Sequence, residues 1–164
     1  MEIEIDLSKE SMKFSSGHFT IFSATERENL HGHNFGVAAA FKAEVGANGL
    51  AVDYGLLKEA VMQVCDSLDE FLLLPLHSPY LKVEERDGLV HVQFAQERLQ
   101  FLPRDVKLLP ISNITVEDLS VWFVETLRGS LPTEIAMLVR ELSVRISSGP
   151  GQGATARWSR SVAP

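Results

Sequence analysis

Three histidines in this chain have the types and spacing of metal ligands. His31 and His33 are separated by one glycine and open a segment, 33–45, in which apolar and polar residues alternate. That alternation is typical of a β-strand, on which residues two apart point to the same face. His18 ends an earlier strand-like segment, 12–19, and antiparallel pairing would bring it beside the other two. Three imidazoles with an open fourth position are the ligand set of a catalytic zinc site.

Spacing alone leaves a plainer interpretation open. An isolated His-x-His pair is weak evidence for a metal, because a three-ligand site also needs the third histidine correctly placed. His77 and His91 lack such spacing and are interpreted as ordinary loop and strand residues. Cys65 lies on an apolar helical stripe, so it is interpreted as a core residue.

The elements that would position these histidines follow from hydrophobic periodicity. Two strands joined by a polar loop are followed by a helix with Asp53 as its N-cap, then by short strands. A second helix begins after Thr115, where Thr-Val-Glu-Asp has the form of a capping box. This order predicts an α+β fold with helices on one face of an antiparallel sheet. The predicted strands are 12–19, 33–45, 89–94, 97–101, 105–109 and 137–147, and the first helix spans 55–68.

Length, charge and cysteine content narrow the class of protein. A chain of 164 residues predicts one domain over 1–164, with a Gly- and Ser-rich, partly flexible tail from about residue 148. The net charge of −7 argues against a nucleic-acid or membrane-surface partner. One cysteine, an acidic start unlike a signal peptide and the absence of a long apolar run indicate a cytoplasmic protein.

Several motifs, taken together, are far more specific than His-x-His. They follow one another in the order of a known family and cover residues from about 12 to 147. The string His31-Gly-His33-Asn34-Phe35 resembles the HGHN motif of the 6-pyruvoyltetrahydropterin synthase family, which includes 6-carboxytetrahydropterin synthase. The other matching segments are Phe14–Phe19, Val52–Lys58, Leu68-Asp69 and Asn113–Leu119. The resemblance implies that His18, His31 and His33 bind Zn²⁺.

The resemblance also implies an architecture. Members have a tunnelling fold (T-fold), an antiparallel four-stranded sheet with two helices on one face. Three subunits close a twelve-stranded barrel, and two trimers stack into a homohexamer with active sites between subunits. Barrel closure on oligomerisation removes the exposed edges of the sheet. The segment around 78–110 is longer than a minimal member needs.

The activity implied is that of a zinc-dependent lyase acting on 7,8-dihydroneopterin triphosphate. The usual catalytic cysteine of the family is replaced here by Arg27. Glu28 instead fits the E-x-x-HGH pattern of members that resemble enzymes cleaving the side chain to 6-hydroxymethyl-7,8-dihydropterin, a folate precursor. Glu28 is thus the candidate general base, and the alternative is that it is one solvated charge among several in a polar loop.

Two other catalytic positions are implied at Asp69 and Glu70, where the family carries Asp-His. Thr115 and Glu117 lie in the segment that resembles the substrate-contacting one. Ser147 occupies the place of the glutamate that anchors the pterin ring, and a hydroxyl cannot form the bidentate pair of a carboxylate.

Three hypotheses remain open at this point. The chain is a zinc lyase on dihydroneopterin triphosphate or a related pterin, or a zinc enzyme of the same fold with a non-pterin or modified-pterin substrate. The third is a non-catalytic relative that binds a small ligand or serves as an assembly subunit.

Overall fold

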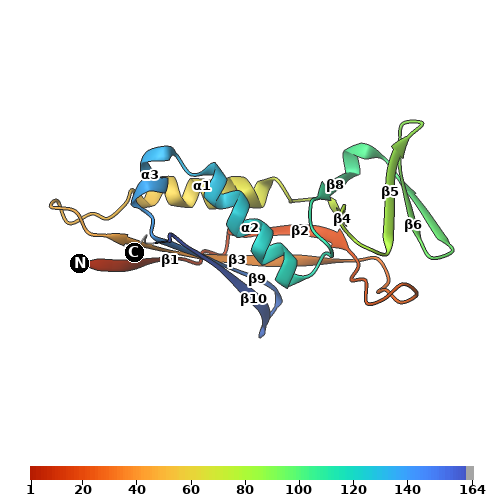
Figure 1. The fold of residues 1–164 in the computed structure, drawn as a ribbon, viewed down its shortest axis with the longest axis horizontal. Helices are drawn as coiled ribbons and strands as arrows, with labels where there is room; N and C mark the ends of the chain where they lie inside the picture. Colours follow the sequence, from red (N-terminus) through yellow and green to blue (C-terminus); the bar gives the residue numbers. More distant parts are fainter. Residues whose placement is uncertain (162–164) are drawn as a thin grey trace.

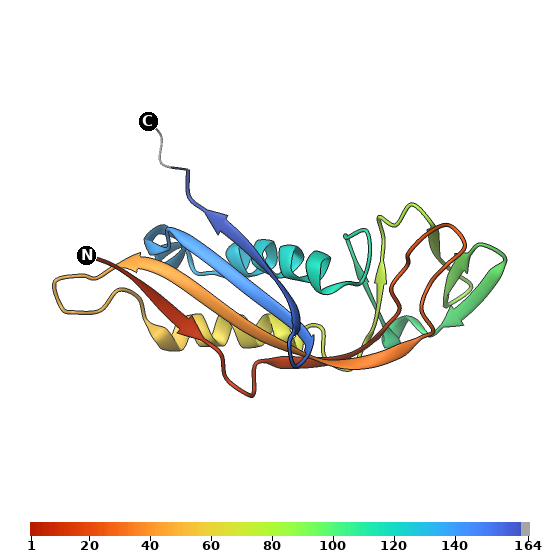
Figure 2. The ribbon, with the colours of Figure 1, turned by 90° about the horizontal axis from the view of Figure 1, so that it is seen from below.

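A curved sheet covered on one face by helices forms the body of the molecule (Figures 1 and 2). The computed structural model describes residues 1–161. The strands are β1 (Glu2–Leu7), β2 (Lys13–His18), β3 (His31–Glu44), β4 (Leu72–Pro75), β5 (Leu81–Arg86), β6 (Leu89–Phe94), β7 (Glu97–Phe101), β8 (Val106–Leu109), β9 (Glu141–Gly149) and β10 (Gln152–Ser159). The helices are α1 (Tyr54–Asp66), α2 (Val116–Ser130) and α3 (Thr133–Leu138), and a single 3-10 turn spans Pro103–Asp105. The class is α+β, as the sequence predicted.

The long strand β3 organises the main sheet. Its first half pairs antiparallel with β2, its second half pairs with β1 on the same side, and β9 pairs on the other. With β10 beside β9, these strands form the expected antiparallel centre. Within residues 1–161 this sheet has seven strands rather than four: the five antiparallel ones, and β4 and β8, which extend it in parallel beyond β2.

The main core lies between this sheet and the helices. Alternate residues of β3 point towards the helix layer, because successive side chains on a strand point to opposite faces. They meet the apolar stripes of α1 and α2, whose buried residues recur at helical spacing. Asp53 caps α1 as predicted, accepting a hydrogen bond from Gly55 N at 2.7 Å. The buried residues of β3 are Phe35, Val37, Ala39, Phe41 and Ala43.

A second, three-stranded sheet of β5, β6 and β7 lies at the end of the molecule away from the chain termini (Figure 1). Its inner face contributes to a separate apolar cluster, which also takes in Phe19 and Ile21 from the loop between β2 and β3. The segment that carries β5, β6 and β7 therefore packs against the loop that leads into the histidine motif. The members of this second cluster are Phe19, Ile21, Leu74, Leu81, Val90, Val92, Phe94 and Val106.

Two sequence predictions differ from the structure near the C-terminus. The segment 137–147 was predicted as one strand, but α3 occupies Thr133–Leu138 and β9 starts only at Glu141. Met137 and Leu138 end the short helix α3, whose N-cap is Pro132, and the strand pattern holds only from Glu141 onwards.

The predicted flexible tail contains a strand. β9 continues to Gly149, and β10 returns antiparallel along it, so the residues from 148 to 159 are mostly regular. Gly151 adopts a positive φ of 78° in the connecting turn, a conformation glycine allows readily. Backbone pairing with β9 supplies order that a Gly- and Ser-rich composition does not indicate.

No helix within residues 1–161 combines the length and apolar character needed to span a bilayer.

Candidate active site

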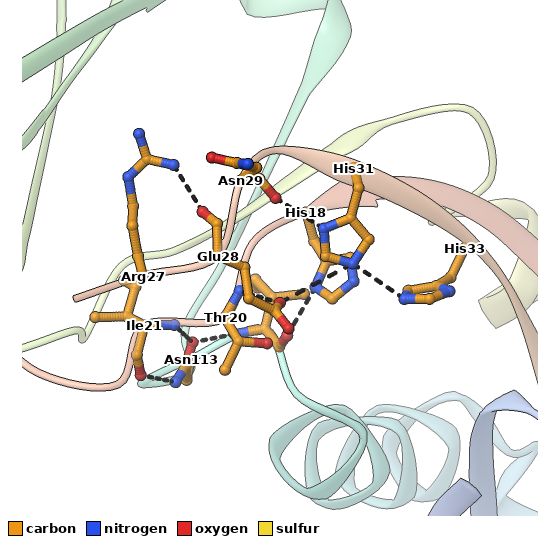
Figure 3. Close-up of polar contacts among 10 residues, drawn as sticks. His18, Thr20, Ile21, Arg27, Glu28, Asn29, His31, His33 and Asn113 are labelled. Atoms are coloured by element: carbon orange, nitrogen blue, oxygen red, sulfur yellow. Dashed lines mark hydrogen bonds and ion pairs between the residues drawn. The ribbon is translucent and has the colours of Figure 1, made fainter.

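His18, His31 and His33 converge on one point, as Figure 3 shows. His18 and His31 are direct partners in the β2–β3 pair, and His33 follows two residues along on the same face. One nitrogen from each ring lies within 4.8 Å of the others. His31 Nε2 and His33 Nε2 are 3.1 Å apart. The expected convergence of three imidazoles is present, and the group could hold a metal ion.

Backbone carbonyls orient two of these rings. His18 Nδ1 donates to Ile114 O at 3.0 Å, and His31 Nδ1 donates to Asn29 O at 2.8 Å. Each bond leaves Nε2 as the free nitrogen, which is the usual arrangement for metal-binding histidines. His18 Nε2 is buried and has no hydrogen-bond partner among the described residues. Burying a polar atom without a partner costs free energy. A metal ion bound at His18 Nε2 would supply that partner, so the site fits a metal ion.

The electrostatics also suit metal binding. Burial lowers the pKa of His18, and the nearby His31 and His33 lower it further against the opposing hydrogen bond to Ile114 O. His18 therefore favours the neutral imidazole, the form in which histidine ligates metals. The Phe35 ring packs beside two of the histidines. Its centroid lies 5.3 Å from the ring centroid of His18 and 5.6 Å from that of His33.

Glu28 lies beside the triad. Its Oε2 is 4.0 Å from His31 Nε2 and accepts a hydrogen bond from Thr20 N at 2.9 Å. Burial by itself would raise the pKa of Glu28, but the hydrogen bonds from Thr20 and the nearby His31 and His18 outweigh it and lower the pKa. The carboxylate is therefore ionised at neutral pH and able to accept a proton.

The loop that carries Glu28 is held from the side of α2. Asn113 Oδ1 accepts from Ile21 N at 3.1 Å, while Asn113 Nδ2 donates to Ile21 O at 2.7 Å. The same turn provides Ile114 O for His18, so one segment before α2 positions both the loop and a histidine. Sequence reasoning identified Asn113 only as part of a motif, because its partner lies 92 residues away.

Asp69 and Glu70 lie in the turn after α1, against β2. Asp69 Oδ1 accepts from Ser15 N at 2.6 Å, and Glu70 N donates to Ser15 O at 2.8 Å. Glu70 has a left-handed backbone, with φ of 63°, and is exposed. Glu70 and His33 line one open cavity of about 570 Å³. Of the three histidines only His33 lines this cavity, together with Ser15 and Asn34 on the opposite face of the sheet, so the structure does not place the Glu70 carboxylate beside the triad.

Thr115 and Glu117 are at the start of α2. Thr115 Oγ1 accepts from Asp118 N at 3.2 Å and is the helix N-cap. The reciprocal bond of a capping box is absent from the described hydrogen bonds, because the Asp118 carboxylate accepts from Asn113 N instead. Glu117 is exposed on the first turn.

Ser147 is not with the triad in this chain. It pairs with Gly36, which lies three residues from His33 on β3 and therefore on the opposite face of the sheet. A Cβ on Gly36 would lie 2.8 Å from Ser147 Oγ, so this glycine makes room for the serine.

Cys65 and the remaining histidines lie outside the site. Burial raises the pKa of Cys65 to about 12, so its thiol stays protonated and cannot act as the base near neutral pH. His77 is in an exposed loop, and His91 lies on β6 next to Gln100.

The match to a family model covers most of the chain. Residues 6–158 match the model described as 6-pyruvoyl tetrahydropterin synthase. A protein of Methanocaldococcus jannaschii, provisionally named 6-carboxy-5,6,7,8-tetrahydropterin synthase, is 29% identical over 158 residues, with 96% of each chain covered.

Solved structures agree with that match. The crystal structure of 6-pyruvoyl tetrahydropterin synthase from Plasmodium vivax superimposes with a TM-score of 0.92, at 26% identity and over 98% of this chain and 99% of that one. Variants of the same Plasmodium protein, in which a glutamate described as a catalytic residue is replaced by alanine or by cysteine, superimpose equally well at 25% identity.

Proposed function

The chain belongs to the 6-pyruvoyl tetrahydropterin synthase family, and we propose that it is a zinc-dependent lyase acting on 7,8-dihydroneopterin triphosphate or a related pterin. Glu28 would be the general base for elimination or cleavage in the pterin side chain. The observation that carries this proposal is the Glu28 carboxylate 4.0 Å from a ring nitrogen of the histidine triad. The catalytic glutamate of the Plasmodium vivax protein supports such a role for a carboxylate on this fold.

His18, His31 and His33 would hold Zn²⁺ through their Nε2 atoms. A bound zinc ion is a Lewis acid that acidifies coordinated hydroxyl groups and stabilises negative charge on oxygen. The buried, unpartnered His18 Nε2 supports a resident cation at this point. Three imidazoles also bind other divalent metals, so the identity of the ion as zinc is a separate part of the proposal from the presence of a metal.

Glu28 would accept a proton from the substrate side chain. The Thr20 amide donates to Glu28 Oε2, the same oxygen that lies 4.0 Å from His31 Nε2, and so holds the carboxylate next to the triad. Its lowered pKa keeps it in the basic form across neutral pH. Asp69 and Glu70 are proposed as the further proton-transfer groups; Asp69 Oδ1 accepts from Ser15 N, and Glu70 is one of the residues that line the same open cavity as His33.

Thr115, Glu117 and Ser147 are the proposed substrate contacts. Thr115 directly follows Ile114, whose carbonyl orients His18, so its hydroxyl belongs to the same turn as the site. Ser147 lies on the opposite face of the sheet from the triad of its own chain. It could contact substrate only in a pocket completed by another subunit.

That geometry supports an assembly. We propose a cytoplasmic homohexamer, a dimer of trimers, built from single-domain subunits. The strand order ends in β10 on one side and in β1 and β8 on the other, so these edges are available to pair when a barrel closes.

A second candidate is a metal enzyme of the same fold with a modified-pterin or non-pterin substrate. Ser147 and Glu70 favour it, because the first cannot anchor a guanidine-like edge bidentately and the second is not a histidine. No Asp or Glu follows Glu141 in the sequence. Glu141 itself is engaged by Lys42 at 3.0 Å near the far end of β9.

The deciding experiment incubates the zinc-loaded protein with 7,8-dihydroneopterin triphosphate and separates the pterin products chromatographically. We expect 6-hydroxymethyl-7,8-dihydropterin from the wild type and a loss of roughly 10²-fold or more in kcat for Glu28→Gln, the usual cost of a lost general base. Glu26→Gln, an exposed change in the same loop, is the matched control and should retain activity. A metal-loaded wild type that leaves the substrate unchanged would reject the first function in favour of the second.

A further inference from the structure

The Arg27 guanidinium joins the Glu28 loop to the small sheet of β5, β6 and β7. Arg27 Nε donates to Glu97 Oε2 on β7 at 2.8 Å, and Nη2 forms an ion pair with the same oxygen. Nη1 donates to the carbonyl oxygen of Glu28 at 2.8 Å (Figure 3). One side chain therefore contacts both the β5–β7 sheet and the backbone of the proposed base.

Two aromatic rings enclose this guanidinium. Its Cζ lies 4.9 Å from the ring centroid of Phe19 and 5.7 Å from that of Phe94 on β6. Both phenylalanines are buried, and only 14% of the Arg27 side chain is exposed. A planar guanidinium held by rings and two acceptors has little freedom to move.

The loop itself is a small hairpin that transmits this restraint. Glu28 N donates to Thr20 O at 2.9 Å, and Ile21 pairs with Arg27 in an isolated antiparallel bridge. Phe22 N donates to Glu26 O at 2.9 Å nearer the tip. Asn113 forms hydrogen bonds with Ile21, on the first strand of this hairpin. Arg27 bonds to the carbonyl of Glu28, on the second strand, so the loss of Arg27 would leave that second strand with fewer restraints.

We propose that Arg27 is a positioning residue. By fixing the hairpin to the β5–β7 sheet, it sets the distance between the Glu28 carboxylate and the histidine triad. This inference rests on the proposed function for its catalytic consequence. It also gives the β5–β7 sheet a role, because Glu97 and Phe94 are the residues of this sheet that contact the guanidinium. Arg27 does not need to touch substrate, since it acts through the backbone of Glu28.

The test compares Arg27→Met, Arg27→Lys and Glu97→Gln with the wild type. Methionine keeps an apolar stem of similar length but removes all three donor contacts, so packing between the rings is largely retained. A displacement of about 1 Å in a catalytic group can cost 10²-fold, so kcat should fall roughly 10- to 100-fold. KM and zinc per chain should change little, because neither the pocket nor the triad is altered.

The other variants grade the effect. Glu97→Gln should lower kcat less than Arg27→Met, since the bond to the Glu28 carbonyl and the rings remain, and the double variant should be no worse than Arg27→Met alone. Arg27→Lys should recover only part of kcat, because an ammonium cannot reproduce the planar fork. Arg98→Met, an exposed change on the same strand, is the matched control and should behave as wild type.

Hydrogen exchange supplies a readout that does not depend on turnover. The amides of Thr20 and Glu28 should exchange faster in Arg27→Met and Glu97→Gln than in the wild type and in Arg98→Met. Unchanged kcat with unchanged exchange in both variants would overturn the inference, and so would a fall in melting temperature alone. If wild type lacks activity on the pterin, the proposed function fails, and faster exchange with intact zinc binding would still support the positioning role.

Discussion

The metal-binding capacity of this site depends on how each imidazole is turned. A histidine side chain can offer either ring nitrogen, and the nitrogen that carries the proton decides which one remains for a ligand. The Ile114 and Asn29 carbonyl oxygens accept hydrogen bonds from Nδ1–H of His18 and His31, so Nε2 remains for the metal in both. Two backbone atoms thus select the useful tautomer before any ion arrives.

At this scale, we expect His31→Ala to abolish stoichiometric metal binding, because two remaining imidazoles cannot supply the three protein ligands of a catalytic zinc site. Zinc per purified chain, measured by plasma mass spectrometry, should fall from about one to near zero. His77→Ala, which removes an exposed histidine away from the triad, should leave the zinc content unchanged.

Chelation gives an independent check on the same residues. Removing zinc from the wild type should lower its melting temperature, since a ligand that binds only the folded state stabilises it. The chelator should leave the melting temperature of His31→Ala where it was. Full zinc content in His31→Ala would contradict the assignment of the triad.

Among the elements, β3 does most to build the site. Its 14 residues are long enough to pair with β2 at one end and with β1 at the other. Because side chains alternate along it, His31 and His33 lie on the same face as the buried Phe35 and Phe41. The metal site is therefore a polar continuation of the core face, and the core anchors it.

The helices cover that core face, and their N-cap residues contribute to the free energy of unfolding. Asp53→Ala should destabilise the fold by about 1 kcal/mol, the typical cost of losing an N-cap side chain, here the one that accepts from Gly55 N. Urea unfolding followed by circular dichroism measures this change, and zinc content should stay as in wild type.

Asp66 offers a control of the same residue type at the other end of α1. Its negative charge lies at the unfavourable end of the helix dipole, so Asp66→Ala should be neutral or slightly stabilising. An equal loss of stability in both variants would contradict the prediction that the N-cap hydrogen bond of Asp53 stabilises the fold.

At the level of the whole molecule, the sheet has unsatisfied edges. β10 ends it on one side and is eight residues long, while β1 and β8 end the other. Long exposed edges are templates for pairing with another chain, and closing a barrel removes them. Ser147 lies on the face of the sheet opposite the triad of its own chain, so its proposed contact with substrate requires a second subunit.

We therefore expect sedimentation equilibrium to report a hexamer, six times the 18.2 kDa chain, with trimers as the smaller species on dilution. Zinc-loaded protein should be used, so that the proposed metal site is in the same state in every subunit. A monomer at micromolar concentration would contradict barrel closure and would leave Ser147 without a route to the site.

The sequence by itself determined the elements whose residues repeat locally. Alternation in 33–45 predicted the long strand and the common face of His31 and His33, and helical spacing predicted α1 together with its Asp53 cap. The motifs around the histidines predicted the family, which the family model confirmed. These features depend on neighbours a few residues apart, so a linear pattern is enough to reveal them.

Tertiary structure alone decided which distant groups meet. Ile114 O reaches His18 across 96 residues, and Glu97 reaches Arg27 across 70. The strand β10 exists because β9 supplies its hydrogen bonds, in a segment whose glycines and serines indicated flexibility. Such contacts follow from the paths of loops and from the packing of whole sheets, and no local periodicity records them.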